Sequence, residues 1–334
     1  MKIFITGVAG FLGSHLADLM ISQGHTVAGN DNMIGGYADN VPQDVEFRQV
    51  DCCDLENMTK AMEGCDIVYH AAATAYEGLS VFSPVLVTRN IFEASVTTIT
   101  AAIRNKVKRI VYCSSMARYG HHDEMPYKET YECRPQDPYG IAKKAGEDVL
   151  RNLCETHGVE YVIAVPHNIV GPRQKYDDPF RNVMSIMLNR MLQGKQPIIY
   201  GDGMQQRCFS YIDDCLYCLN ALAFQDNVVG EIINIGPDEE PITINELAEA
   251  CANETGINLD PIHHKDRPKE VKLAVCSSDK ARKLLGYNTA TDMRQSVRKT
   301  AEYIRTRGTK KFQYHLPLEI INDKTPETWK NKLI

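Results

Sequence analysis

The chain has 334 residues, enough for one large domain or two lobes, and its 43% hydrophobic and 24% charged residues are typical of a globular protein. A net charge of −6 without a basic stripe argues against nucleic acid as a partner. No apolar run is long enough to span a bilayer, no signal-peptide pattern is present, and eleven scattered cysteines suit reduced thiols. We therefore expect a cytoplasmic protein with no membrane partner and no metal site.

The first residues predict a strand, a glycine turn and a helix. Lys2–Thr6 is a β-branched and aromatic run, and an apolar helical pattern follows the three glycines Gly7, Gly10 and Gly13. Gly7 would make the tight turn, Gly10 would let the backbone approach a pyrophosphate, and Gly13 would allow close helix packing. This order predicts a dinucleotide-binding site.

A second short strand begins at Thr26 and ends at Asp31. An acid about 20 residues past such glycines can hold the adenosine ribose hydroxyls, and it would repel a 2′-phosphate. Asp31 therefore favours NAD over NADP. The alternative is that Asp31 only caps a turn before Asn32.

Strands and helices then alternate. Further strands are predicted at 45–50, 66–70, 108–114 and 160–165, with helices at 55–62, 83–105 and from about residue 139. Such alternation predicts an α/β fold with a doubly wound parallel (Rossmann) sheet and ligands at the carboxyl ends of its strands. Residues 71–73 are three alanines, small enough for a cofactor to lie against.

The alternation breaks after about residue 168. We predict a dinucleotide-binding domain at 1–168, a smaller mixed substrate-binding lobe at 169–307 that can add elements to the sheet, and a C-terminal extension at 308–334. A capping box from Thr243 to Glu246 opens a helix to about residue 255, and a short helix at 278–285 stops at Gly286. The extension is expected to wrap the body or a partner subunit, and nothing in its sequence suggests chemistry.

A phenol and an ammonium lie four residues apart, at Tyr139 and Lys143. Residues at this spacing share one face of a helix, so both side chains can reach the same small volume. A free tyrosine has a pKa of about 10, and a neighbouring positive charge favours the phenolate. We therefore expect Lys143 to lower the pKa of Tyr139 into the range of a useful general base.

From residue 2 to about residue 305 the chain resembles the extended short-chain dehydrogenase/reductase family, in particular its nucleoside-diphosphate-sugar epimerases and dehydratases and most of all the UDP-glucose 4-epimerase-like enzymes. The matching motifs occur in the family's order: the glycine turn, Asp31-Asn32, Asp51, the His70 to Ala73 run, Asn90, Ser114-Ser115, Tyr139-x-x-x-Lys143, Asn168-x-x-Gly171, and Tyr200-Gly-Asp-Gly203.

The resemblance implies roles for individual residues. The catalytic group is Ser115, Tyr139 and Lys143. The residues implied to bind NAD are Gly7, Gly10, Phe11, Leu12, Gly13, Asp31, Asn32, Asp51, Cys52, Ala72, Asn90, Tyr139, Lys143 and Pro166. Those implied to bind the nucleotide sugar are Ser115, Asn168, Arg207 and Arg267, the two arginines meeting the diphosphate.

Family dehydratases carry acids in the two positions after the catalytic hydroxyl. Here those positions hold Met116 and Ala117, which cannot transfer a proton. The resemblance therefore implies a UDP-sugar 4-epimerase acting on a UDP-hexose or UDP-uronate through a 4-keto intermediate. The alternative is a net oxidoreductase, either a 4-ketosugar reductase or a sugar dehydrogenase. A 4,6-dehydratase or a non-catalytic nucleotide-binding protein is less favoured.

The sugar stays open in the sequence. Arg118, Lys175 and Arg181 are the cations that could pair with a uronate carboxylate, and the sequence does not choose among them. Family relatives often form homodimers by pairing the helix near 83–105 with the helix that carries Tyr139. We expect a homodimer of the same kind here.

Overall fold

The computed structural model describes residues 1–268 and 271–334, and a seven-stranded parallel sheet is its centre. The strand order is β11-β6-β5-β4-β1-β2-β3. These strands are β1 (Lys2–Thr6), β2 (Thr26–Asn30), β3 (Val45–Arg48), β4 (Ile67–His70), β5 (Arg109–Cys113), β6 (Glu160–Pro166) and β11 (Ile232–Ile235). The predicted α/β fold with a doubly wound parallel sheet is confirmed.

Helices cover both faces of this sheet because its strands are apolar on both sides. In β1, Ile3 and Ile5 point to one face and Phe4 to the other, as the twofold period of a strand requires. The first face packs on α1 (Phe11–Ser22), α8 (Ile212–Phe224) and α10 (Asp279–Leu285). The second face packs on α2 (Leu55–Ala61), α5 (Ala94–Arg104) and α6 (Pro138–His157).

The helical region predicted at 83–105 is divided. After the short α3 (Glu77–Ser80), it consists of α4 (Pro84–Thr88), a π-helical turn at Arg89–Glu93, and α5. A π-turn inserts an extra residue into a helix and often accompanies a functional site. This one contains Asn90, one of the residues predicted to contact the cofactor.

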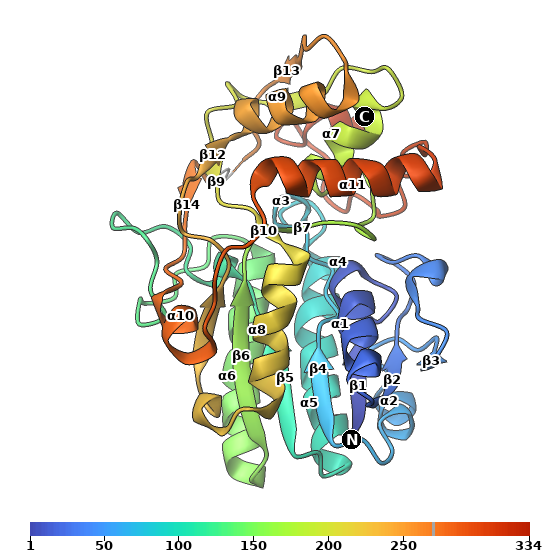
Figure 1. Ribbon diagram of the computed structural model, residues 1–334, viewed down its shortest axis with the longest axis vertical. Helices are drawn as coiled ribbons and strands as arrows, with labels where there is room; N and C mark the ends of the chain where they lie inside the picture. Colours follow the sequence, from blue (N-terminus) through green and yellow to red (C-terminus); the bar gives the residue numbers. More distant parts are fainter. Residues whose placement is uncertain (269–270) are drawn as a thin grey trace.

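A smaller lobe lies above the carboxyl ends of the strands (Figure 1). Its core is formed by α7 (Val183–Met191), α9 (Ile244–Thr255) and α11 (Met293–Arg307). Short strands complete it: β7 (Ile169–Val170) pairs with β10 (Ser210–Tyr211), β8 (Ile198–Tyr200) with β13 (Ile262–His264), and β9 (Gln206–Arg207) with β12 (Ile242–Thr243) and β14 (Leu273–Ala274). The predicted capping box is confirmed, because Thr243 and Glu246 hydrogen-bond reciprocally at the start of α9.

The central sheet and the helices that cover it include elements from both before and after residue 168. Strand β11 pairs with β6, and α8 and α10 pack on the first face, although all three follow residue 168. The smaller lobe thus consists of segments that lie before, between and after these three elements. The predicted helix at 278–285 is confirmed as α10, with Gly286 left-handed at its end.

The C-terminal segment 308–334 returns along the body after α11 and contains the one-turn α12 (Glu327–Lys330). Glu319 accepts hydrogen bonds from the backbone N–H groups of Val85 (2.8 Å) and Leu86 (2.9 Å) at the start of α4. The segment therefore wraps the body of its own chain. Among the described residues, no helix is long and apolar enough to cross a membrane.

Candidate active site

One cavity of about 490 Å³ lies between the carboxyl ends of the strands and the smaller lobe. This is where ligands bind in doubly wound folds. Every residue predicted to bind the cofactor or the substrate, or to act in catalysis, lines this cavity. They come from the glycine turn, the ends of five strands, the π-turn, α6 and the smaller lobe.

The glycine turn is built as its spacing predicts. Gly7 has φ +70°, and a Cβ there would lie 2.8 Å from the Cα of Ala72. A Cβ at Gly13 would lie only 2.2 Å from the carbonyl oxygen of Gly7. Any side chain would push α1 away from the turn, so these glycines bring the N-terminus of α1, with Gly10 as its cap, to the cavity. A helix N-terminus favours phosphate groups.

Asp31 lies at the end of β2 and ties the glycine turn to the next loop. Its carboxylate accepts hydrogen bonds from the backbone N–H groups of Ala9 (3.1 Å) and Met33 (2.7 Å). Burial raises the pKa of Asp31, and these backbone bonds oppose that shift. The local capping role and the predicted ribose role are therefore compatible, because Asp31 also lines the cavity.

Asp51 lies beside Asn32, whose amide donates to the Asp51 carboxylate at 3.3 Å. The backbone N–H of Cys53 (2.8 Å) and the guanidinium of Arg89 (3.4 Å) also contact Asp51. Burial raises the pKa of Asp51, but these hydrogen bonds outweigh it and lower the pKa below its ordinary value. The carboxylate is therefore held ionised in the part of the cavity that is predicted to bind NAD.

The wall between the glycine turn and the π-turn is narrow and polar. The backbone N–H of Ala72 donates to the hydroxyl of Thr6 at 3.0 Å. The amide of Asn90 donates to the hydroxyl of Thr74 at 3.0 Å, and Asn90 is buried. Residue 72 thus offers only a methyl group to the cavity, and residue 90 offers an amide that is held in place.

Tyr139 and Lys143 enter the cavity from the first turns of α6. Pro138 begins the helix, and Asp137 caps it by accepting a hydrogen bond from the N–H of Gly140 at 2.8 Å. Both side chains are buried, and the Lys143 ammonium donates to the carbonyl oxygen of Cys113 at 2.7 Å. The predicted pairing on one helical face is present.

The expected lowering of the Tyr139 pKa is not found. Burial raises the pKa of Tyr139 to about 12, and the leading groups that oppose this rise are Ser115 and Arg181, rather than Lys143. Burial also lowers the pKa of Lys143 to about 8. Desolvation disfavours both charged forms, and it outweighs the attraction that the spacing alone suggests.

Ser115 lies opposite Tyr139, at the end of β5. Its hydroxyl accepts a hydrogen bond from the N–H of Ala117 at 3.2 Å and so caps a short 3₁₀ turn. Met116 follows, buried and lining the cavity. Met116 thus presents a thioether to the cavity, whereas Ala117 does not line it and packs against the cluster that contains Tyr139.

Apart from Ser115, the residues predicted to bind the substrate lie in the smaller lobe or at its start. Asn168 adopts φ +46°, and its amide donates to the carbonyl oxygen of Cys208 at 2.9 Å. Arg207 lies in β9, and its guanidinium donates to the carbonyl of Gln206 at 2.7 Å. Arg267 stacks on the ring of Tyr200 with 4.9 Å from its guanidinium carbon to the ring centroid. Both guanidinium groups line the same cavity and offer the planar donors that suit a diphosphate.

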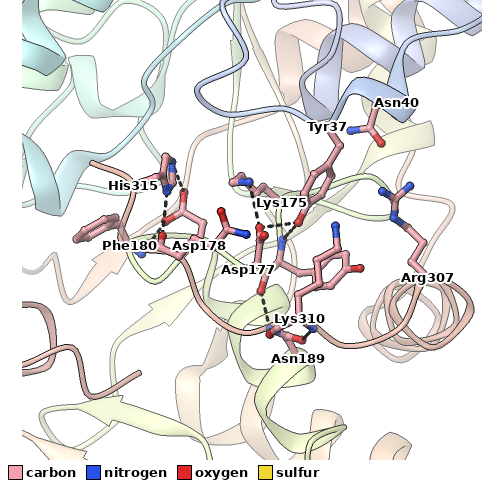
Figure 2. A network of polar contacts seen from close by, with 12 residues as sticks. Tyr37, Asn40, Lys175, Asp177, Asp178, Phe180, Asn189, Arg307, Lys310 and His315 are labelled. Atoms are coloured by element: carbon pink, nitrogen blue, oxygen red, sulfur yellow. Dashed lines mark hydrogen bonds and ion pairs between the residues drawn. The ribbon is translucent and has the colours of Figure 1, made fainter. Parts of the chain in front are cut away.

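The three cations that could pair with a uronate carboxylate have different surroundings in the structure. Arg118 is buried in an ion pair with Glu147 at 2.8 Å and does not line the cavity. Lys175 lines it but pairs with Asp177 at 3.1 Å and lies over the ring of Tyr37, as Figure 2 shows. Arg181 lines the cavity as well and lowers the pKa of Tyr139.

Several residues of the cavity were not predicted from the sequence. Asp178 is buried, accepts a hydrogen bond from the Tyr76 hydroxyl, and has its pKa raised by burial. Glu77 lies at the start of α3 and raises the pKa of Tyr139. Trp329 also lines the cavity, although it lies in a segment in which the sequence suggested no chemistry. These residues follow no motif, so only their position in the fold reveals them.

Known proteins resemble the chain over most of its length. A Methanocaldococcus jannaschii protein provisionally named a UDP-glucose 4-epimerase is 31% identical over 91% of this chain and 98% of its own. The UDP-glucose 4-epimerase structure from Thermotoga maritima, with UDP-glucose, is 29% identical with a TM-score of 0.87 over 92% of this chain and 99% of its own. The UDP-glucuronic acid 4-epimerase structure from Bacillus cereus, with UDP-glucuronic acid and NAD, is 28% identical with a TM-score of 0.84 over 92% and 100%.

The residues of the cavity fit NAD. The glycine turn brings the N-terminus of α1 to the cavity, and such an N-terminus favours phosphate groups. Asp31 offers the cavity a carboxylate, an acceptor for hydroxyl groups, and Ala72 offers only a methyl group. The model of the family described as NAD dependent epimerase/dehydratase family matches residues 3–236. The chain therefore belongs to the NAD dependent epimerase/dehydratase family, and its cofactor is NAD.

Proposed function

We propose that the protein is a UDP-sugar 4-epimerase. The observation that carries this proposal is the shared cavity, in which Tyr139 and Lys143 face the glycine turn and the diphosphate-binding candidates Arg207 and Arg267. Met116 and Ala117 follow Ser115 without an acid, which supports simple redox at C4 over sugar dehydration.

Tyr139 acts as the general base at the 4-hydroxyl of the sugar. It takes the hydroxyl proton while C4 loses a hydride and becomes a ketone, and it returns the proton after the sugar has turned over. Ser115 hydrogen-bonds the same hydroxyl, while Lys143 binds the nicotinamide ribose and adds positive charge. NAD supplies the acceptor and later the donor of the hydride. General base catalysis of this kind contributes about 10²- to 10⁴-fold in rate.

The position of Arg181 supports a uronate as the sugar. Its guanidinium carries a positive charge in the part of the cavity that contains Tyr139, and it donates to the carbonyl oxygen of Ala75. A carboxylate on C5 of the substrate would pair with such a group, whereas a neutral hexose would not require it. Lys175 is already paired with Asp177 and is the weaker candidate.

The direct test uses the NAD-loaded protein with UDP-glucose, UDP-glucuronate and their N-acetyl relatives, with Tyr139→Phe as the variant. We expect the wild type to form the C4 epimer of at least one substrate and the variant to lose that activity. Full activity in Tyr139→Phe would contradict the mechanism. Lys144→Met, which removes an exposed cation one position from Lys143, is the matched control and should retain activity.

The alternative is a net oxidoreductase that uses the same three residues. Such an enzyme consumes or produces NADH in proportion to its product, whereas an epimerase shows no net turnover of the cofactor. Asp31 at the ribose position speaks against an NADPH-dependent reductase. NADH absorbance measured during substrate conversion separates the two functions.

The homodimer is a further part of the proposal. Val85 in α4 and Ile141 in α6 are 72% and 54% exposed, and these two helices pack side by side. Exposed apolar side chains on adjacent helices are typical of a protein interface. Light scattering after size-exclusion chromatography should give twice the chain mass, and Ile141→Glu should shift the protein toward monomer.

A further inference from the structure

The C-terminal segment 308–334 lies against α7 and against the preceding loop, which carries Lys175 and Arg181. The carbonyl oxygen of Lys310 accepts a hydrogen bond from the Asn189 amide at 2.9 Å, and the Lys310 N–H donates back to Asn189 at 3.0 Å. The N–H of Gln313 donates to the carbonyl oxygen of Asp177 at 2.8 Å. Figure 2 shows this contact region, with Lys310 and His315 on the segment facing Asp177 and Asp178.

The middle of the segment is fixed to α4. Besides the two bonds from Glu319 to the start of this helix, the Ser83 hydroxyl donates to the carbonyl oxygen of Pro317 at 2.6 Å. The segment thus has two anchors, one on the smaller lobe and one on the sheet domain. Beyond residue 319, the side chains of Thr325, Thr328 and Trp329 are buried.

The last residues reach the cavity itself. Trp329 is 2% exposed and packs edge-on against Phe82 and Phe180, with ring centroids 6.1 and 5.4 Å apart. Thr328 hydrogen-bonds the hydroxyl of Tyr200. Trp329 and Ile334 both line the cavity.

Trp329 and Arg267, the arginine predicted to bind the diphosphate, both lie beside Gly78. A Cβ on Gly78 would lie 3.4 Å from the Trp329 ring and 3.5 Å from the Arg267 guanidinium, so both groups close over this glycine. Arg267 in turn stacks on Tyr200, whose hydroxyl Thr328 holds. On its other side Trp329 contacts Phe180, the neighbour of Arg181.

We infer that segment 308–334 is the wall of the nucleotide-sugar site beside the diphosphate, where Thr328 and Trp329 position Tyr200 and Arg267. This inference rests on the proposed function, since it assumes a nucleoside diphosphate as the ligand of Arg267.

The first test uses the fluorescence of Trp329, the only tryptophan of the chain. NAD-loaded protein is titrated with UDP while tryptophan emission is recorded, and the same titration is followed by calorimetry. We expect an emission change that saturates with the calorimetric Kd. If calorimetry detects UDP binding but the emission does not change, segment 308–334 is not a wall of the site, and the proposed function still stands. If calorimetry detects no UDP binding, both this inference and the proposed function are contradicted.

The second test changes one hydroxyl. Thr328→Val keeps the side-chain volume but removes the bond to Tyr200, and it should weaken UDP binding about fivefold, the effect of one lost hydrogen bond. Thr328→Ser should restore the affinity, and Lys330→Ala, an exposed residue of the same helical turn, should leave it unchanged. The Kd for NAD should stay the same in all three variants. An unchanged UDP affinity in Thr328→Val, or an equal loss of NAD affinity, would contradict the inference.

Discussion

The guanidinium of Arg181, on the smaller lobe, lowers the pKa of the Tyr139 phenol at the start of α6. Arg181 also lowers the pKa of Lys143. The positive charge of Arg181, on the smaller lobe, thus affects Tyr139 and Lys143, which belong to the sheet domain. Burial remains the larger effect and leaves the pKa of Tyr139 raised to about 12.

Replacing Arg181 should therefore shift the pH dependence of the reaction. A phenol acts as a base only after it loses its proton, so the rate rises with pH toward the pKa of Tyr139. Arg181→Gln removes a positive charge, raises that pKa further, and should move the rise of kcat to higher pH by about one unit, or about tenfold in rate at fixed pH.

The pH profile should be measured with UDP-glucose, so that loss of a carboxylate partner on the substrate does not interfere. Lys175→Gln is the matched control, because it removes a cation of the same cavity that is already paired with Asp177. Equal shifts in both variants would show that Arg181 has no specific effect on Tyr139.

Asp31→Asn should weaken the preference for NAD. The substitution keeps only one of the two carboxylate oxygens that accept from the N–H groups of Ala9 and Met33, and it removes the charge that repels a 2′-phosphate. We expect the ratio of the Kd values for NADP and NAD to fall about tenfold, which corresponds to one charge-assisted hydrogen bond. Calorimetry with both dinucleotides measures this ratio, and an unchanged ratio would assign Asp31 to the turn alone.

Gly13→Ala should destabilise the protein, whereas Gly35→Ala should not. A Cβ at Gly13 would lie 2.2 Å from the Gly7 carbonyl oxygen, but a Cβ at Gly35 would meet no atom within 4 Å. Because backbone cannot move aside as a side chain does, we expect the free energy of unfolding of Gly13→Ala to fall by at least about 2 kcal/mol. Urea denaturation compares the two variants, and equal stability would refute the close packing of α1 on the turn.

Glu147→Gln should be among the most destabilising single substitutions in α6. Glu147 and Arg118 are 1% and 3% exposed and lie 2.8 Å apart, so the variant leaves a buried guanidinium without its counter-charge. The expected loss is about 3–5 kcal/mol in the free energy of unfolding. Asp148→Asn, which breaks an exposed pair with Lys144 on the same helix, should cost less than about 1 kcal/mol. Similar losses in both variants would contradict the account.

The features that the sequence predicted correctly are local ones. The glycine turn, the strand that ends at Asp31 and the capping box at Thr243 each depend on residues a few positions apart, so their patterns specify them. The motif residues also meet in one cavity, because the carboxyl ends of parallel strands lie at one edge of a sheet.

The features that the sequence missed depend on contacts between distant residues. Burial raises the pKa of Tyr139, and Ser115 and Arg181 oppose that rise, which no spacing reveals, so the expected lowering of this pKa is not found. Strand β11 itself was not predicted, although the part after residue 168 was expected to add elements to the sheet, because its pairing with β6 joins residues far apart in the sequence. Trp329 follows Lys310 and Glu319, which fix the C-terminal segment to residues far away in the sequence. Neither of these contacts forms a sequence motif.

The most direct test of the proposed epimerase is proton NMR of the reaction in D₂O with NAD-loaded protein and UDP-glucuronate or UDP-glucose. We predict that both C4 epimers accumulate, that C4 and C5 keep their hydrogen, and that no net NADH forms, because the hydride leaves and returns within one cavity. Deuterium at C5, loss of water from the sugar, or NADH formed in proportion to product would contradict the account.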